Sequence, residues 1–183
     1  MQTIGGVPRD EVLKVAEEVV KRFLVLPENK KPERTGGYFT IQHKESGKRY
    51  FINEIGQCLP EMDHDCFLYV QEKTRRLGMM NVISKHISAW QSRNRERHEY
   101  AGAIMTPADS KGIEEGRDLI GGFSGINEHS EEAILLVIWM IFRWMTLEDS
   151  REICAISDNQ LFEPLLIACN DLFDRSIGNA RKA

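Results

Sequence analysis

The feature that most constrains the fold of this chain is an uninterrupted apolar run of ten residues, Ala133 to Phe142. Glu131 and Glu132 precede it, at positions suited to the first turn of a helix. A bilayer span needs about 20 such residues, so the run predicts a buried helix. A helix that is apolar on every face must be covered on every face, and one sheet covers only one of them. We therefore expect the C-terminal segment or a second subunit to cover the rest.

Aromatic residues in and just after this run are candidates for a subunit interface. Trp139, Phe142 and Trp144 carry the large apolar side chains that dominate association energies. The sequence therefore predicts a homo-oligomer with these residues in its interface.

Length and charge limit the class of protein. The 183 residues fit a single domain, with a core over residues 10–145 and a C-terminal extension over residues 146–183. A net charge of -4 argues against a nucleic-acid partner, which would need a broad basic surface. We interpret the basic cluster of Arg93, Arg95, Arg97 and His98 as a solvated linker, with an anion-binding patch as the alternative.

Two features indicate a cytoplasmic protein. The first residues include Gly5, Gly6 and Pro8, where a signal peptide would have a continuous apolar stretch. The 4 cysteines form no Cys-x-x-Cys pair, so we expect reduced thiols.

Hydrophobic periodicity and turn residues predict an α+β fold. The expected strands are 38–43 and 48–55, joined as a hairpin, then 100–105, 118–123 and 152–156. The expected helices are 8–26, 61–77 with a break at Gly78 and a continuation to Trp90, 131–145, and 161–173 with Ser157 and Gln160 as its capping box.

Several segments in this order resemble the GlcG/HbpS-like family of heme-binding and heme-degrading-type domains. They are the hairpin Phe39 to Ile55 with its Ser46-Gly47 turn, the helix Phe67 to Leu77 with Glu72-Lys73-Thr74, the strand Tyr100 to Ile104, and Ile120-Gly121-Gly122-Phe123-Ser124-Gly125 followed by Glu131-Glu132-Ala133.

The resemblance implies a profilin-like domain with a central antiparallel sheet of about five strands flanked by helices, and here with a C-terminal strand-helix extension. It also implies a homo-oligomer that binds a small ligand, with heme or another tetrapyrrole as a candidate cofactor. A GAF-like sensor domain has a similar order of elements and is the structural alternative. A structural or assembly protein that uses the apolar helix as a partner interface is the functional alternative.

The candidate ligand-binding residues are Ser124, Gly125, His129, His86 and Lys73. Ser124 and Gly125 end a strand just before a helix, where free amides and the helix dipole favour an anion. His129 follows that turn, and His86 is predicted on an apolar helical face with Ile83. The resemblance adds Lys73. For both histidines the alternative is a structural role.

Signals for metal binding or catalysis are weaker. Asp63, His64 and Asp65 lie between Cys58 and Cys66, but their spacing matches no standard zinc site, and helix capping by Asp63 or Asp65 explains the acids. No metal site is predicted. No P-loop, nucleophile or dinucleotide motif is visible, so we expect a binding protein and name no catalytic residue.

Overall fold

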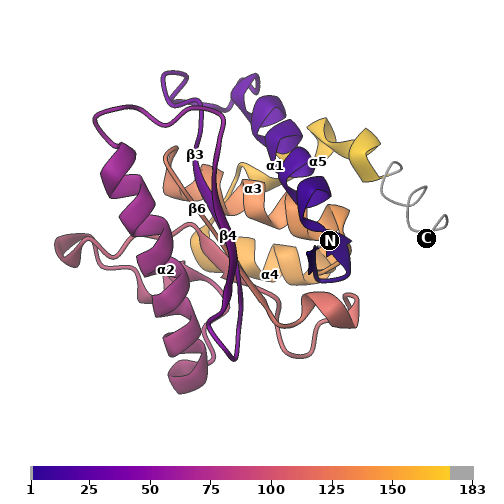
Figure 1. Ribbon diagram of the computed structural model, residues 1–183. Coiled ribbons are helices and arrows are strands. Elements are labelled where there is room, and N and C mark those ends of the chain that lie inside the picture. The colour runs from indigo at the N-terminus through magenta and orange to yellow at the C-terminus, as the bar shows by residue number, and fades with distance from the viewer. Residues whose placement is uncertain (1, 174–183) are drawn as a thin grey trace.

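The computed structural model describes residues 2–173, which form a four-stranded sheet between two layers of helices (Figure 1). The elements, in chain order, are β1 (Thr3–Ile4), β2 (Val7–Pro8), α1 (Arg9–Leu24), β3 (Gly37–His43), β4 (Arg49–Ile55), α2 (Asp63–Ser84), η1 (Ala89–Ser92), η2 (Arg95–Arg97), β5 (Ala103–Met105), η3 (Glu114–Gly116), β6 (Leu119–Ser124), α3 (Glu128–Ile141), α4 (Leu147–Ser157) and α5 (Phe162–Ala168).

The main sheet has the strand order β4-β3-β6-β5, and every pairing is antiparallel. The predicted hairpin is confirmed as β3 and β4, and Gly47 in its turn has φ +64°. The predicted third and fourth strands are confirmed as β5 and β6. The α+β class is therefore established, with four strands in this sheet instead of about five.

The predicted strand 152–156 is wrong, because this segment belongs to α4. Thr146 and Asp149 form a capping box that starts the helix, each side chain accepting a hydrogen bond from the other's backbone amide. Short runs of mixed apolar and polar residues are ambiguous between strand and helix, and the cap decides this one. The C-terminal extension therefore contributes two helices, α4 and α5, and no strand within residues 147–168.

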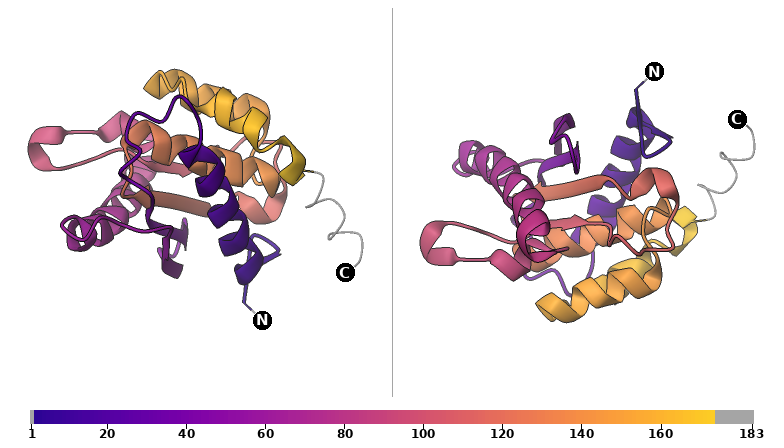
Figure 2. Two further views of the ribbon diagram at one scale, coloured as in Figure 1. Left: turned by 90° about the horizontal axis from the view of Figure 1, so that it is seen from above. Right: turned by 90° about the horizontal axis from the view of Figure 1, so that it is seen from below.

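Helices cover both faces of the sheet. α2 packs on β3, β5 and β6 on one face, while α1 and α3 pack on the other. α4 and α5 lie outside α3 and complete a further layer, as the two views of Figure 2 show. None of the helices in residues 2–173 is long and apolar enough to cross a membrane.

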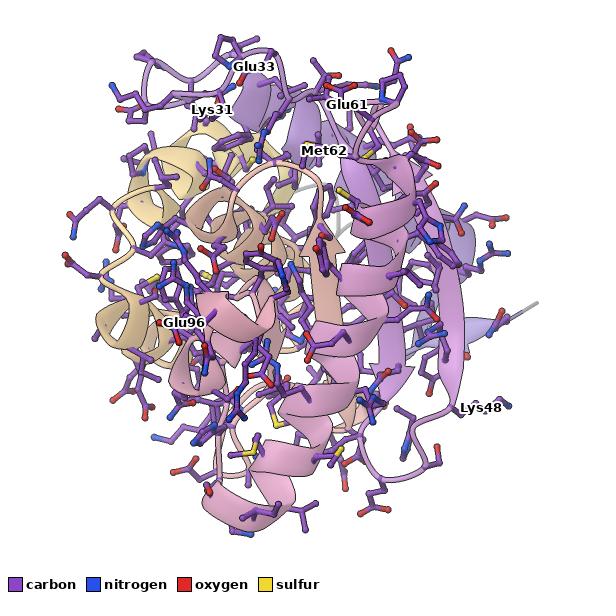
Figure 3. The ribbon with its side chains drawn as sticks, turned by 90° about the vertical axis from the view of Figure 1, so that its left-hand side faces the viewer. Lys31, Glu33, Lys48, Glu61, Met62 and Glu96 are labelled. Atoms are coloured by element: carbon purple, nitrogen blue, oxygen red, sulfur yellow. The ribbon has the colours of Figure 1, made fainter. Side chains whose placement is uncertain are left out.

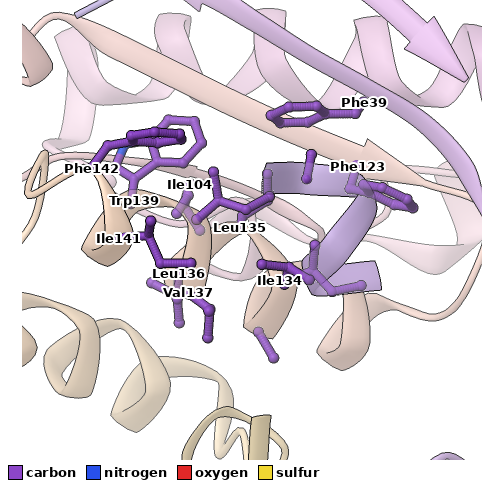
Figure 4. Packing of buried hydrophobic residues seen from close by; sticks show 14 of the residues in the cluster. Phe39, Ile104, Phe123, Ile134, Leu135, Leu136, Val137, Trp139, Ile141 and Phe142 are labelled. Atoms are coloured by element: carbon purple, nitrogen blue, oxygen red, sulfur yellow. The ribbon is translucent and has the colours of Figure 1, made fainter. Parts of the chain in front are cut away.

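This arrangement buries the apolar helix α3 within one chain. Every residue from Ala133 to Trp139 is 0% exposed. Phe39 and Trp139 lie on the sheet side of α3, and Leu136 and Val137 face the outer helices (Figure 4). The sequence left open whether the C-terminal segment or a second subunit covers the outer side of α3. In the structure the C-terminal extension covers it.

The predicted interface residues need correction for the same reason. Trp139 and Trp144 are fully buried and pack edge to face with ring centroids 5.2 Å apart. The Trp144 indole donates to the carbonyl of Gly5 at 2.9 Å, and Phe142 packs against the Trp144 ring. These side chains are core residues that tie α3 to the N-terminus, so they are not available to a partner.

Helix α2 also differs from its prediction. It runs through Gly78 without a break. Gly78 faces β6, where a Cβ would lie 3.3 Å from the Ile120 side chain. The helix stops at Ser84, where Lys85 adopts φ 58°, and so it does not continue to Trp90. Its N-cap is Met62 without a side-chain hydrogen bond, so Asp63 and Asp65 do not cap it.

The other helix predictions are confirmed in position but not in every detail. The first helix is α1, and the last begins at Phe162 without a side-chain cap. Ser157 and Gln160 therefore form no capping box, and Ser157 instead donates its hydroxyl to Glu132.

Candidate functional site

A cavity of about 290 Å³ opens where the N-terminal half of α2, the end of β6 and the start of α3 meet. Figure 3 faces this side of the molecule, with Met62 at the top of α2, the loop of Lys31 and Glu33 above, and Glu96 across from the helix. The cavity is lined by Arg34, Met62, Cys66, Tyr69, Lys73, Arg95, Tyr100, Ser124, Gly125, Ile126, Asn127, Glu128 and Glu131. The predicted residues Ser124, Gly125 and Lys73 therefore meet at one site.

The base of the cavity is a buried ion pair between α2 and α3. Lys73 Nζ donates to Glu131 Oε2 at 2.9 Å and to the carbonyl of Phe123 at 2.8 Å. The two side chains are only 1% and 6% exposed. Gly102 makes room for the pair, because a Cβ at this position, which has φ +90°, would lie 2.2 Å from Glu131 Oε2. Burying an unpaired charge is costly, and here the ammonium of Lys73 and the carboxylate of Glu131 neutralise each other.

The same carboxylate closes the anion site that the sequence predicted at the strand end. Glu131 Oε1 accepts from the amide of Gly125 at 2.9 Å and from that of Ile126 at 3.3 Å. The amides are therefore taken by a side chain of the protein, and the prediction that they hold a ligand carboxylate is wrong. Glu131 is in effect an internal anion at the N-terminal end of the helix.

The first turn of α3 fixes another wall of the cavity. Asn127 caps the helix by accepting from the amide of Ser130 at 3.1 Å. Glu128 accepts from Arg93 through two bonds of 2.7 and 2.8 Å, from Arg95 at 2.9 Å and from the amide of Ala101 at 2.9 Å.

These bonds determine the ionisation of Glu128. Burial alone would raise its pKa, but the hydrogen bonds from Arg93, the Ala101 amide and Arg95 outweigh burial and lower the pKa to about 2. The interpretation of the basic cluster as a solvated linker is therefore wrong for Arg93, which is half-buried and binds α3, whereas Arg95 binds α3 with its side chain 68% exposed. Arg97 and His98 are exposed.

The side walls of the cavity are largely aromatic and apolar. The rings of Tyr69 and Tyr100 meet edge to face with centroids 4.9 Å apart. Arg34 reaches in from the loop before β3 and donates to the carbonyl of Ile126. Burial raises the pKa of the Cys66 thiol, so it is protonated at neutral pH and contributes an apolar surface.

Neither predicted histidine lines the cavity. The His129 Nε2 atom lies 3.0 Å from the carbonyl of Ser157, and its ring packs on Trp90 with centroids 4.5 Å apart. His86 follows the end of α2, so it is not on the helical face where the pattern placed it, and its carbonyl accepts from Asn81 at 2.8 Å. Neither of the two imidazoles expected to bind heme iron therefore lines this cavity.

A second buried polar cluster surrounds Glu132, which is 0% exposed. Ser88 donates to its Oε2 atom at 2.7 Å, while Ser157 and Asn159 donate to Oε1, Asn159 at 3.1 Å. Burial raises the pKa of Glu132, and these hydrogen bonds only partly oppose the effect. The cluster joins η1, α3 and the end of α4, so it has a structural role.

Sequence reasoning missed Arg34, Tyr69, Tyr100 and the roles of Glu128 and Glu131 in the site. Only the two glutamates had a signal in the sequence, which was their place at the start of a helix whose later residues are apolar. In the structure each is the partner of cations from other elements, Glu128 of Arg93 and Arg95, and Glu131 of Lys73.

Residues 2–173 contain no group of three or more His, Cys, Asp or Glu side chains placed to hold a metal ion. The segment from Cys58 to Cys66 has another role, because Asp63 accepts from the Tyr38 hydroxyl at 2.7 Å and Cys58 donates its amide to Glu54 at 2.8 Å. Comparisons of the chain with protein-family models, with curated proteins and with solved structures find no match.

Proposed function

We propose that this chain is a small-molecule-binding domain whose ligand occupies the cavity between α2 and the start of α3. One observation carries the proposal: buried charges, two tyrosines and apolar side chains from four separate segments converge on a single concave site. Ligand pockets typically combine apolar walls with a few fixed polar groups and start at about 300 Å³. A volume of about 290 Å³ suits a molecule of one or two rings.

The walls of the site are held before any ligand arrives. Lys73 and Glu131 link α2 to α3, and Glu128 links α3 to the segment that carries Arg95 and Tyr100. A preformed site loses little conformational entropy on binding, which favours affinity. Because the ionisable groups at the base are engaged with one another, the arrangement supports binding better than catalysis.

Heme does not fit this proposal. The two imidazoles expected to hold its iron lie outside the cavity, and His129 is engaged with the carbonyl of Ser157. A smaller planar ligand needs no axial residue and can pack against Tyr69 and Tyr100.

Binding can be tested by nuclear magnetic resonance with a panel of neutral one-ring and two-ring aromatic compounds. We expect compounds of the panel to shift the amide signals of Gly125, Ile126 and Asn127. Tyr69→Ala should weaken these compounds about fivefold or more, since an aromatic contact contributes about 1 kcal/mol. Phe67→Ala is the matched control, because Phe67 lies in the same helix and does not line the cavity.

The proposal fails if no compound shifts the cavity amides, or if Tyr69→Ala and Phe67→Ala weaken binding equally.

A further inference from the structure

The charges around the cavity select a class of ligand. Three of its lining side chains are basic, Arg34, Lys73 and Arg95, and two are acidic, Glu128 and Glu131. Arg93 lies just outside and also binds Glu128, so that carboxylate is shared between two guanidinium groups. The site is therefore locally positive in a chain whose net charge is -4. Such a local excess attracts anions to one place on an otherwise acidic protein.

The acidic lining groups are not free to receive a cation. Glu131 is bonded to Lys73 and to two backbone amides, and Glu128 accepts four hydrogen bonds. Each carboxylate is therefore neutralised within the protein. The charge of Lys73 is paired with Glu131, so the remaining lining cations are Arg34 and Arg95.

Arg34 is the first of these cations. It is half-buried and donates to the carbonyl of Ile126, and the ion pairs formed within residues 2–173 do not include it. A guanidinium has five N–H donors in a planar fork that matches a carboxylate. The carbonyl oxygen of Ile126 occupies only some of the N–H donors of Arg34, and because it carries no net charge it leaves the guanidinium charge unpaired.

Arg95 is the second cation; it lies far from Arg34 in the sequence but lines the same cavity. It shares Glu128 with Arg93, and its side chain is 68% exposed. Its contribution is therefore weaker and more sensitive to salt than that of Arg34.

We propose that the ligand of this cavity is an aromatic carboxylate, or a flat oxyanion of similar size, with its ring against Tyr69 and Tyr100 and its negative group on Arg34, assisted by Arg95. This inference rests on the proposed function and adds the chemical class of the ligand. It follows from the pairing of charges, since an apolar aromatic wall beside an unneutralised guanidinium matches a molecule with one flat face and one negative end.

The test uses 2-naphthoate and 2-naphthamide, which share size and shape and differ in charge. We expect the full chain to bind 2-naphthoate about tenfold more tightly than the amide, as a charge-assisted hydrogen bond would give. Arg34→Gln should remove that tenfold preference and leave 2-naphthamide binding unchanged. Arg34→Lys should keep part of the preference, and Arg95→Gln should reduce it by about threefold.

Arg97→Gln is the matched control, because Arg97 is an exposed arginine of the same segment as Arg95 and does not line the cavity. It should leave both affinities unchanged. Raising the salt concentration should weaken 2-naphthoate alone.

The possible results separate this inference from the proposed function. If both compounds shift the cavity amides with equal affinity, or if Arg34→Gln leaves the preference intact, the anionic class is wrong and binding at the cavity stands. If neither compound binds while the neutral panel does, the inference is overturned alone. If nothing shifts the cavity amides, both proposals are overturned.

Discussion

Lys73 on α2 and Glu131 on α3 form an ion pair of 2.9 Å that reaches past the end of β6 and connects helices on opposite faces of the sheet. The Glu131 carboxylate also holds the turn between β6 and α3 through the amides of Gly125 and Ile126. One pair of residues therefore sets both the packing of the helices and the base of the cavity.

We expect Lys73→Met to destabilise the protein by about 3 kcal/mol or more, because it leaves the carboxylate of Glu131 buried without its cation. The double variant Lys73→Met with Glu131→Gln should lose less than the sum of the two single losses, since neither buried charge remains. Urea unfolding of the four proteins measures the coupling. Additive losses would show that the pair does not act as a unit.

Glu132 should make stability depend on pH. Its pKa is raised in the folded protein, mainly by burial, above the unfolded value of about 4.3. The stability linked to its proton is therefore present below about pH 4.3 and is lost as the pH rises through the raised folded pKa. Glu132→Gln removes this dependence, so the unfolding free energy of the variant relative to the parent should increase from about pH 4 to about pH 8.

The control for Glu132 is Glu152→Gln, because Glu152 is an exposed carboxylate of α4. Chemical unfolding at several pH values should give a flat difference for this control. A flat difference for Glu132→Gln as well would contradict the raised pKa.

Glu128 should have the opposite dependence. Its pKa of about 2 lies below the unfolded value of about 4.3, so its contribution to stability is present above about pH 4.3 and is lost as the pH falls through about 2. Glu128→Gln should therefore destabilise the protein at neutral pH and have a smaller effect in acid. Unfolding at about pH 7 and about pH 3 measures this, and an equal loss at both values would contradict it.

Gly121 and Gly78 should respond differently to alanine. A Cβ on Gly121 would lie 2.1 Å from the Trp139 ring, which is fully buried and cannot move aside. We expect Gly121→Ala to cost about 2 kcal/mol or more through overpacking. At Gly78 a Cβ would meet the end of the Ile120 side chain at 3.3 Å, and alanine gains about 1 kcal/mol of helix propensity.

Thermal or urea unfolding of the two alanine variants provides the comparison. Gly78→Ala should be neutral or stabilising. Equal losses at both positions would show that the Trp139 contact is not the cause.

The sequence by itself determined the elements whose signals are local. The amphipathic helix α1, the hairpin of β3 and β4, and the apolar helix α3 follow from periodicity and turn residues, and the structure contains each. The same pattern indicated that α3 must be covered on all sides, and it is. Of the five candidate ligand-binding residues, Lys73, Ser124 and Gly125 line one cavity, while His129 and His86 do not.

Tertiary structure alone decided what covers α3 and which charges meet. The C-terminal helices cover the face of α3 that carries Leu136 and Val137. The apolar run could not specify this cover, because any apolar surface would bury it equally well. Glu131 accepts a hydrogen bond from the Gly125 amide, which the sequence suggested was free for a ligand. Because α2 ends at Ser84, His86 does not lie on the helical face where it was predicted. Hydrogen bonds and ion pairs are directional and short in range, so they depend on which distant segments the fold brings within about 3 Å of one another.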